Sequence, residues 1–260
     1  MRIVVAAAAC LALGACAGGA IGGIWAAAAP EQVSAASPHI LAAVADPRRP
    51  EADRARDELR HPAEMLAFAQ VRPGQVIADV GPGAGYYTRM LAAAVGPDGR
   101  AYGIIRPPAP DATQRAAIYA VAESGAYANL LVSPQDWQNW APPEPFDTIF
   151  ISQIYHDFHL ARFNYDVAAI NRSMFAALKP GGALVIIDHA ATIGSGLSVV
   201  DSLHRIEGAK VREEVEAAGF VFEAASWALV NLADDHTLRV FEGDVRGRTD
   251  QFVLRFRKPG

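Results

Sequence analysis

The chain has 260 residues, 52% of them hydrophobic, which is enough to bury the core of one domain and leave an N-terminal extension. A formal net charge of −5 at pH 7, with no lysine- or arginine-rich run, argues against nucleic acid as a standing partner, because such partners require a basic face. Both cysteines, Cys10 and Cys16, lie near the N-terminus, so the rest of the chain offers no thiol for a disulfide, a catalytic nucleophile or a cysteine-ligated zinc site.

The first residues have the pattern of a secretory signal, with one charge at Arg2 followed by an apolar stretch and small residues. Leu13-Gly-Ala-Cys16 resembles the lipobox of bacterial lipoproteins. It predicts a signal peptide at residues 1–16 and a periplasm-facing, extracytoplasmic protein held at a membrane by a lipid on Cys16. The alternatives are a membrane-spanning segment within residues 3–29, ordinary signal cleavage near residues 26–29, and a misassigned start codon upstream of a cytosolic enzyme.

Residues 17–50 are rich in Ala, Gly, Ser and Pro, a composition that predicts a tether rather than a packed core. The folded domain is therefore expected at residues 51–260. It opens with a charged, helix-permissive segment at residues 51–60 and a second helix from Pro62, whose apolar residues recur at helical spacing.

From residue 76 the sequence alternates strands with helices. Strands are predicted at residues 76–80, 100–105, 129–133, 148–152, 183–188, 220–230 and 251–257, and helices at 86–95, 111–124, 160–178 and 199–218. Strands joined by crossover helices imply an α/β fold with a doubly wound, mostly parallel sheet. Ligands of such sheets bind outside the carboxyl ends of the strands.

A glycine-rich turn after the first of these strands is predicted to hold a ligand. Gly81, Gly83 and Gly85 occupy alternate positions, where the absence of a Cβ lets a ligand approach the main chain. Asp79 is placed to accept hydrogen bonds from the loop amides or from the ligand. The spacing Asp-x-Gly-x-Gly-x-Gly is neither a dinucleotide fingerprint nor a Walker loop, which favours a nucleoside without a pyrophosphate. The alternative is a plain strand-to-helix connector.

Further polar clusters follow the third, fourth and fifth strands, at residues 133–137, 152–157 and 188–189. Because parallel strands end at the same edge of a sheet, these clusters are expected to lie together. Structural polar residues have no reason to gather at one edge, so their positions predict a site there.

Three of these motifs resemble those of class I S-adenosylmethionine-dependent methyltransferases: the loop at residues 79–85, the segment 145–152 and the segment 178–188. More narrowly, the chain is similar to a family of predicted exported methyltransferases. The residues that carry this second similarity are Tyr155-His-Asp157, Ile187-Asp-His189, Gly194-Ser-Gly-Leu197, Leu203-His-Arg-Ile206 and the segment 214–220. The resemblance implies a Rossmann-like sheet of seven strands, the last inserted antiparallel, and S-adenosyl-L-methionine as cofactor.

The same resemblance implies roles for the loop residues. The sequence departs from the pattern of the class at the end of the second strand. Gly81, Gly83 and Gly85 would approach the methionine portion of the cofactor. Asp136 would approach the adenine amine, with a loop or helix-cap role as the alternative. The class usually ends its second strand with a carboxylate that holds the ribose hydroxyls, whereas Gly103-Ile-Ile-Arg-Pro107 carries none.

The predicted catalytic residues are His156, Asp157, His189 and His204. Methyl transfer is an in-line displacement that needs positioning, plus a base where the acceptor loses a proton, and histidine exchanges protons near neutral pH. The alternatives are a packing role for His156 and a surface role for His204 on its predicted helix. The same His and Asp residues could instead ligate a metal, since imidazole plus carboxylate suits several divalent ions. No His-x-x-x-His or His-Glu-x-x-His spacing supports this alternative, so no metal site is predicted.

The sequence therefore predicts a methyltransferase that uses S-adenosyl-L-methionine and acts on a small-molecule acceptor. A different class of function remains open, namely a non-catalytic extracytoplasmic protein that retains the fold to bind another small ligand. The absence of a carboxylate after the second strand would fit such a protein, because that carboxylate holds the ribose of S-adenosylmethionine in the class.

Overall fold

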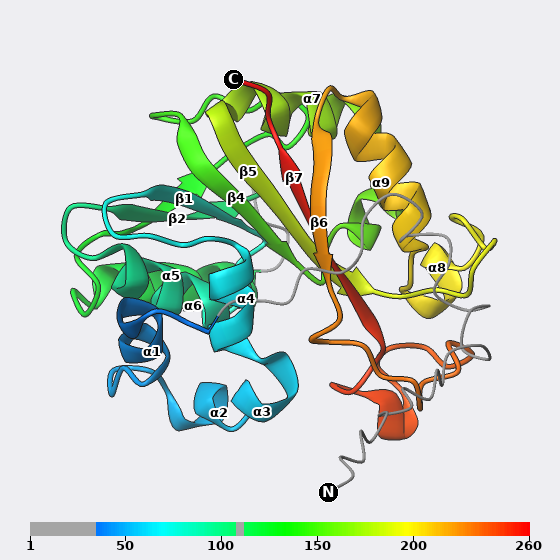
Figure 1. Ribbon diagram of the computed structural model, residues 1–260, viewed down its shortest axis with the longest axis horizontal. Helices are drawn as coiled ribbons and strands as arrows, with labels where there is room; N and C mark the ends of the chain where they lie inside the picture. The colour runs from blue at the N-terminus through cyan, green and yellow to red at the C-terminus, as the bar shows by residue number, and fades with distance from the viewer. Residues whose placement is uncertain (1–34, 108–111) are drawn as a thin grey trace, which may run out of the picture.

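The computed structural model describes residues 35–107 and 112–260. A seven-stranded sheet forms the centre of the molecule, in the order β3-β2-β1-β4-β5-β7-β6 (Figure 1). The strands are β1 (Val76–Val80), β2 (Arg100–Ile105), β3 (Leu130–Pro134), β4 (Phe146–Ser152), β5 (Leu178–His189), β6 (Val221–Ser226) and β7 (Gln251–Arg257). The first five are parallel, and β7 lies antiparallel between β5 and β6. The predicted doubly wound α/β fold is confirmed, including its antiparallel last strand.

Helices cover both faces of this sheet. They are α1 (Pro38–Val44), α2 (Glu51–Arg54), α3 (Asp57–Arg60), α4 (Pro62–Phe68), α5 (Tyr86–Val95), α6 (Ala112–Glu123), α7 (Val167–Ala177), α8 (Val200–Leu203) and α9 (Gly208–Ala217). Helices α1, α4 and α5 lie on one side, and α7 and α9 on the other (Figure 1). Successive side chains of a strand point to opposite faces, so Ile77 packs with the first group and Ala78 with the second.

Residues 38–50 are folded, where the sequence predicted the end of a tether. In α1, Ile40 and Ala43 are buried against the helices of the domain. The fully buried Arg49 guanidinium donates to both carboxylate oxygens of Asp57, at 2.8 and 2.6 Å. A short helix that begins at a proline and buries two apolar residues leaves little periodic signal in an alanine-rich segment. The predicted signal peptide, Cys16 and tether residues 17–34 lie outside the described residues.

The helix predicted at residues 199–218 is broken into α8 and α9. His204 ends α8 in the left-handed region, with φ 55°, and Ile206 forms a bridge beside β5, so the chain leaves the helical path between them. The reason is Arg205, whose buried guanidinium lies 2.8 Å from the Asp234 carboxylate and donates to the carbonyl oxygens of Ala190 and Leu238. Satisfying that buried charge outweighs the helical periodicity of the segment.

Two other predicted helices differ at their starts. The helix expected from residue 160 begins at Val167, because the Asp166 carboxylate caps it by accepting from the Ala169 amide at 3.0 Å. The chain before it forms two 3-10 turns, His156–His159 and Ala161–Phe163. The helix predicted at residues 111–124 is α6, which begins at Ala112; residue 111 lies outside the described residues.

Candidate functional site

The glycine loop runs from the end of β1 to the start of α5, as predicted. Gly81, Gly83 and Gly85 all have left-handed backbones, with φ of 66°, 54° and 84°, which side-chain-bearing residues adopt at a cost. A Cβ on Gly81 would lie 2.6 Å from the Ile154 side chain, whereas one on Gly83 would meet no atom within 4 Å. The loop thus presents bare main chain to open space at Gly83, while Ile154 packs beside Gly81.

Asp79 is buried under this loop and is bonded to α5. Its carboxylate accepts a hydrogen bond of 2.6 Å from the Thr88 hydroxyl. Burial raises the pKa of Asp79 to about 7, although the Thr88 bond acts in the opposite direction. Asp79 therefore ties the loop to the helix that follows it.

The raised pKa of Asp79 predicts a pH-dependent stability. A carboxyl group whose pKa is higher in the folded state stabilises the fold at low pH, and that contribution is lost as the pH rises through about 7. Between pH 5 and pH 8 the wild type should lose about 2–3 kcal/mol of unfolding free energy relative to Asp79→Asn. Urea denaturation of both proteins at the two pH values measures this difference, and parallel pH profiles would contradict it.

The residues after β2 and β3 lie at the same edge of the sheet. Arg106 follows β2, where the class carries a carboxylate, and it donates to the Tyr165 hydroxyl at 2.6 Å and lies 4.9 Å from the centre of the Phe163 ring. Asp136 is exposed in a turn after β3, where its carboxylate accepts from the Gln138 amide at 3.1 Å. A ligand contact by Asp136 stays a prediction.

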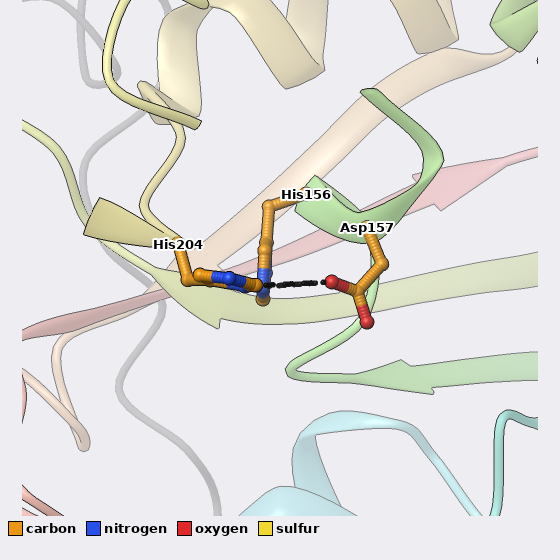
Figure 2. A group of neighbouring side chains, drawn as sticks. All are labelled: His156, Asp157 and His204. Atoms are coloured by element: carbon orange, nitrogen blue, oxygen red, sulfur yellow. Dashed lines mark ion pairs between the residues drawn. The ribbon is translucent and has the colours of Figure 1, made fainter. Parts of the chain in front are cut away.

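Three of the four predicted catalytic residues form one cluster, His156, Asp157 and His204 (Figure 2). Asp157 Oδ1 lies 3.3 Å from Nε2 of His156 and 3.6 Å from Nδ1 of His204. The two imidazole rings are 5.4 Å apart at their centres and nearly perpendicular. His156 and Asp157 come from the turn after β4, and His204 from the left-handed residue after α8.

Asp188, at the end of β5, orients His156 and was not among the predicted catalytic residues. Its fully buried carboxylate accepts from the His156 amide at 2.7 Å, from His156 Nδ1 at 2.8 Å and from the His189 amide at 2.8 Å. Nδ1 of His156 therefore carries a hydrogen, and Nε2 faces Asp157. Burial alone would lower the pKa of His156, but the negative charge and hydrogen bond of Asp188 outweigh it and raise that pKa.

The fourth predicted residue, His189, lies beside the cluster. Its ring centre is 5.7 Å from that of His156, and its Nδ1 is 2.6 Å from the Thr249 hydroxyl. Burial lowers the pKa of His189 to about 4, so the ring is neutral at pH 7. Burial, together with the positive charges of His156 and Arg239, also lowers the pKa of His204 to about 4.

The segment after β6 supplies partners that the sequence did not predict. Arg239 Nη2 lies 3.1 Å from Nε2 of His204, and Asp234 pairs with Arg205. Arg239 and Asp234 are each more than 25 positions from their partners, His204 and Arg205. The motif Leu203-His-Arg-Ile206 contains both of these partners, but no sequence signal pointed to Arg239 or Asp234.

A hollow of about 290 Å³ opens next to the start of β7. It is lined by residues in and next to α3, including Glu58 and His61, and by residues within the segments 228–231 and 247–251. Two of its lining residues reach toward the site: Thr249 contacts His189, and Gln251 contacts Gln153, which in turn accepts from Arg60 at 2.7 Å. The hollow is at the edge of the sheet where β4 and β5 end.

Comparison with known proteins identifies relatives of the part of the chain that carries the glycine loop, His156, Asp157 and His189. The family model for protein-L-isoaspartate(D-aspartate) O-methyltransferase matches residues 57–191. A protein-L-isoaspartate O-methyltransferase 1 of Arabidopsis thaliana is 34% identical over 140 residues, 53% of this chain and 55% of that protein. The Triticum aestivum enzyme named protein-L-isoaspartate O-methyltransferase is 31% identical over 137 residues, 50% and 52% of the two chains.

The chain thus spans about half the length of these curated relatives. Among solved structures, a SAM dependent methyltransferase from Aquifex aeolicus superposes with a TM-score of 0.55 at 20% identity, over 78% of this chain and 93% of that one. That likeness concerns the fold. His204, Asp234 and Arg239 all lie beyond residue 191, outside the matched segment.

Proposed function

Because the chain belongs to the protein-L-isoaspartate(D-aspartate) O-methyltransferase family, we propose that it transfers a methyl group from S-adenosyl-L-methionine to an acceptor held at the carboxyl edge of its sheet. The observation that carries this proposal is the family match over residues 57–191, which includes the glycine loop and the ends of β1, β4 and β5. The cofactor would lie against the main chain at Gly83, where the loop faces open space.

The chemistry asked of the protein is modest. When bound, S-adenosylmethionine would supply the methyl group: a lone pair of the acceptor would form the new bond to the methyl carbon, in line with the carbon–sulfur bond. That bond would break with its electron pair moving to sulfur, which leaves S-adenosylhomocysteine. Where the acceptor carries a proton, Nε2 of His156 would accept it, because Asp188 holds Nδ1 as a donor and stabilises the imidazolium. His189 and His204 would line the acceptor side.

We propose a small molecule as the acceptor. The hollow of about 290 Å³ beside Thr249 has a volume near the lower end of small-ligand sites. The segment that supplies His204 and Arg239 lies outside the family match. The match therefore gives no reason to expect the relatives' acceptor at this side of the site.

Calorimetric titration with S-adenosylmethionine and S-adenosylhomocysteine tests the cofactor assignment. The expected result is binding of both, with dissociation constants on the order of micromolar. A folded protein that gives no heat with either would contradict the proposal. It would favour instead a non-catalytic protein that binds another small ligand at the same edge.

An isoaspartyl residue of a damaged peptide is the second candidate acceptor, because the curated relatives are named for that activity. Transfer of labelled methyl groups from S-adenosylmethionine to an isoaspartyl peptide, compared with its aspartyl counterpart, distinguishes the two. An isoaspartyl product is a methyl ester and loses its label in base. Label found on the isoaspartyl peptide and not on the aspartyl peptide would contradict the proposal of a small-molecule acceptor and favour the isoaspartyl residue.

We also propose that the domain is exported and lipid-anchored at Cys16, on the pattern of residues 1–16. No helix within residues 35–107 and 112–260 is long and apolar enough to cross a membrane. Metabolic labelling with palmitate in a bacterial host should mark the wild type and be lost in Cys16→Ser. Label that persists in Cys16→Ser would defeat the lipid anchor.

A further inference from the structure

We propose that His156, Asp157 and His204 form a binding site for a divalent first-row transition-metal ion. One ligand atom of each residue lies within 4.8 Å of the other two (Figure 2). The residues supply two imidazole nitrogens and one carboxylate, a donor set that suits zinc, iron or nickel rather than magnesium. Neither the spacing of these residues in the sequence nor the family match marks such a site.

The distances fit an ion with small adjustments. Ligands held at 2.0–2.1 Å around a tetrahedral zinc ion stand about 3.4 Å apart. Asp157 Oδ1 is 3.3 Å from His156 Nε2 and 3.6 Å from His204 Nδ1, so both of these separations are already close to that value. The remaining separation, between one nitrogen of each imidazole, is at most 4.8 Å, and rotation of the rings toward a bound ion would shorten it.

His156 is oriented as a metal ligand. Its Nδ1 donates to Asp188, so the lone pair of Nε2 points at Asp157 and the position of the ion. A carboxylate behind a histidine fixes the tautomer and raises the basicity of the coordinating nitrogen. Asp188 is itself held by two backbone amides, and this arrangement therefore exists before any ion enters.

His204 provides a second, independent observation. Its side chain is only 6% exposed, yet its Nδ1 has no hydrogen-bond partner and is directed toward Asp157. Its backbone is left-handed, with φ 55°, a conformation kept by the break between α8 and α9. A buried nitrogen without a partner costs stability, and an ion could bind this nitrogen once its hydrogen has moved to Nε2.

Arg239 acts as a competitor in the ion-free protein. Arg239 Nη2 lies 3.1 Å from Nε2 of His204, and an arginine can only donate, so Nε2 of His204 accepts this hydrogen bond. The hydrogen of the neutral His204 ring is therefore on Nδ1. Coordination through Nδ1 moves that hydrogen to Nε2, and Arg239 must then turn away. Arg239 is partly exposed, so it has room to do so. Arg239 should therefore weaken ion binding.

The site would be open rather than closed. Asp157 is 31% exposed, which leaves a path for the ion, and three protein ligands leave coordination positions free for an oxygen of the acceptor. A bound ion would occupy Nε2 of His156, so activation of the acceptor would pass from the imidazole to the ion. Ion binding itself does not depend on the proposed methyl transfer.

The test is calorimetric titration of zinc into the full chain carrying Cys10→Ser and Cys16→Ser, after removal of metals with a chelator. We expect one zinc ion per chain with a dissociation constant of about 10 μM or lower, and no binding of magnesium. His204→Asn and Asp157→Asn should each weaken zinc binding at least about tenfold. Asparagine tolerates the left-handed backbone of residue 204. Arg239→Gln, whose carbonyl can accept from Nε2, should strengthen binding.

The matched control is His159→Gln. His159 lies in the same 3-10 turn as His156, but its Nε2 contacts Glu214 at 2.9 Å, away from the cluster, so its loss should leave zinc affinity unchanged. Absence of zinc binding at about 100 μM, or wild-type affinity in Asp157→Asn, would overturn the site. Asp157→Asn decides the matter if circular dichroism shows that His204→Asn is unfolded. Weaker zinc binding in Arg239→Gln would overturn coordination through Nδ1.

Discussion

Replacing Gly83 by valine should weaken binding of S-adenosylmethionine by at least about 100-fold while the secondary structure remains intact. Gly83 has φ 54°, a backbone that a β-branched residue strongly disfavours, and its missing Cβ faces open space where the cofactor is expected. A valine there would fill that space and press the loop out of its shape. Calorimetry with S-adenosylmethionine measures the loss of affinity, and far-ultraviolet circular dichroism measures the secondary structure.

Gly125→Val is the matched control for backbone strain. Gly125 also has a left-handed backbone, with φ 70°, and a Cβ added there would likewise meet no atom within 4 Å, but it lies between α6 and β3, at the opposite edge of the sheet. This variant should lose stability to a similar extent and bind the cofactor like the wild type. If Gly83→Val bound S-adenosylmethionine with wild-type affinity, the glycine loop would not be part of the cofactor site.

Replacing Asp234 by alanine should destabilise the fold by about 3–5 kcal/mol, because it leaves a buried guanidinium without its counter-charge. Both side chains of the Arg205–Asp234 pair are fully buried, and they are 2.8 Å apart. Asp234 also accepts from the amides of His236 and Asp250, at 3.1 and 2.7 Å, and so holds the loop between β6 and β7. Urea denaturation measures the loss.

Two further variants separate charge burial from general damage. Glu213→Ala removes a partner of Lys210 from an ion pair in which Glu213 is 70% exposed, and it should change stability by less than about 1 kcal/mol. The double variant Arg205→Met, Asp234→Leu should recover part of the stability lost in Asp234→Ala, because no unpaired charge remains. The amides of His236 and Asp250 still lack their acceptor in this variant, so recovery should be incomplete. An Asp234→Ala protein as stable as Glu213→Ala would show that the buried pair contributes little.

The local elements of this fold were predictable because their signals are local. Strands β1, β2 and β7 and helix α5 have the predicted bounds, since short apolar runs, turn residues and helical spacing all act within a few positions. The glycine loop was predicted for the same reason, as Gly81, Gly83 and Gly85 are each required by their own backbone angle. Segments 38–50 and 199–218 were predicted wrongly. The first is folded because Ile40 and Ala43 pack against other helices of the domain, and the second is broken where Arg205 pairs with Asp234, 29 positions away.

The sequence by itself determined the α/β class, the position of the loop and the edge of the sheet at which His156, Asp157 and His189 gather, since parallel strands end together. Only the tertiary structure brought His204 to Asp157, Asp188 to His156 and Arg239 to His204. The physical reason is that these contacts join residues tens of positions apart. They form because a buried charge or a buried ring nitrogen destabilises the fold unless it is hydrogen-bonded or paired. The periodic pattern of apolar residues along the chain does not show which distant residue will be that partner.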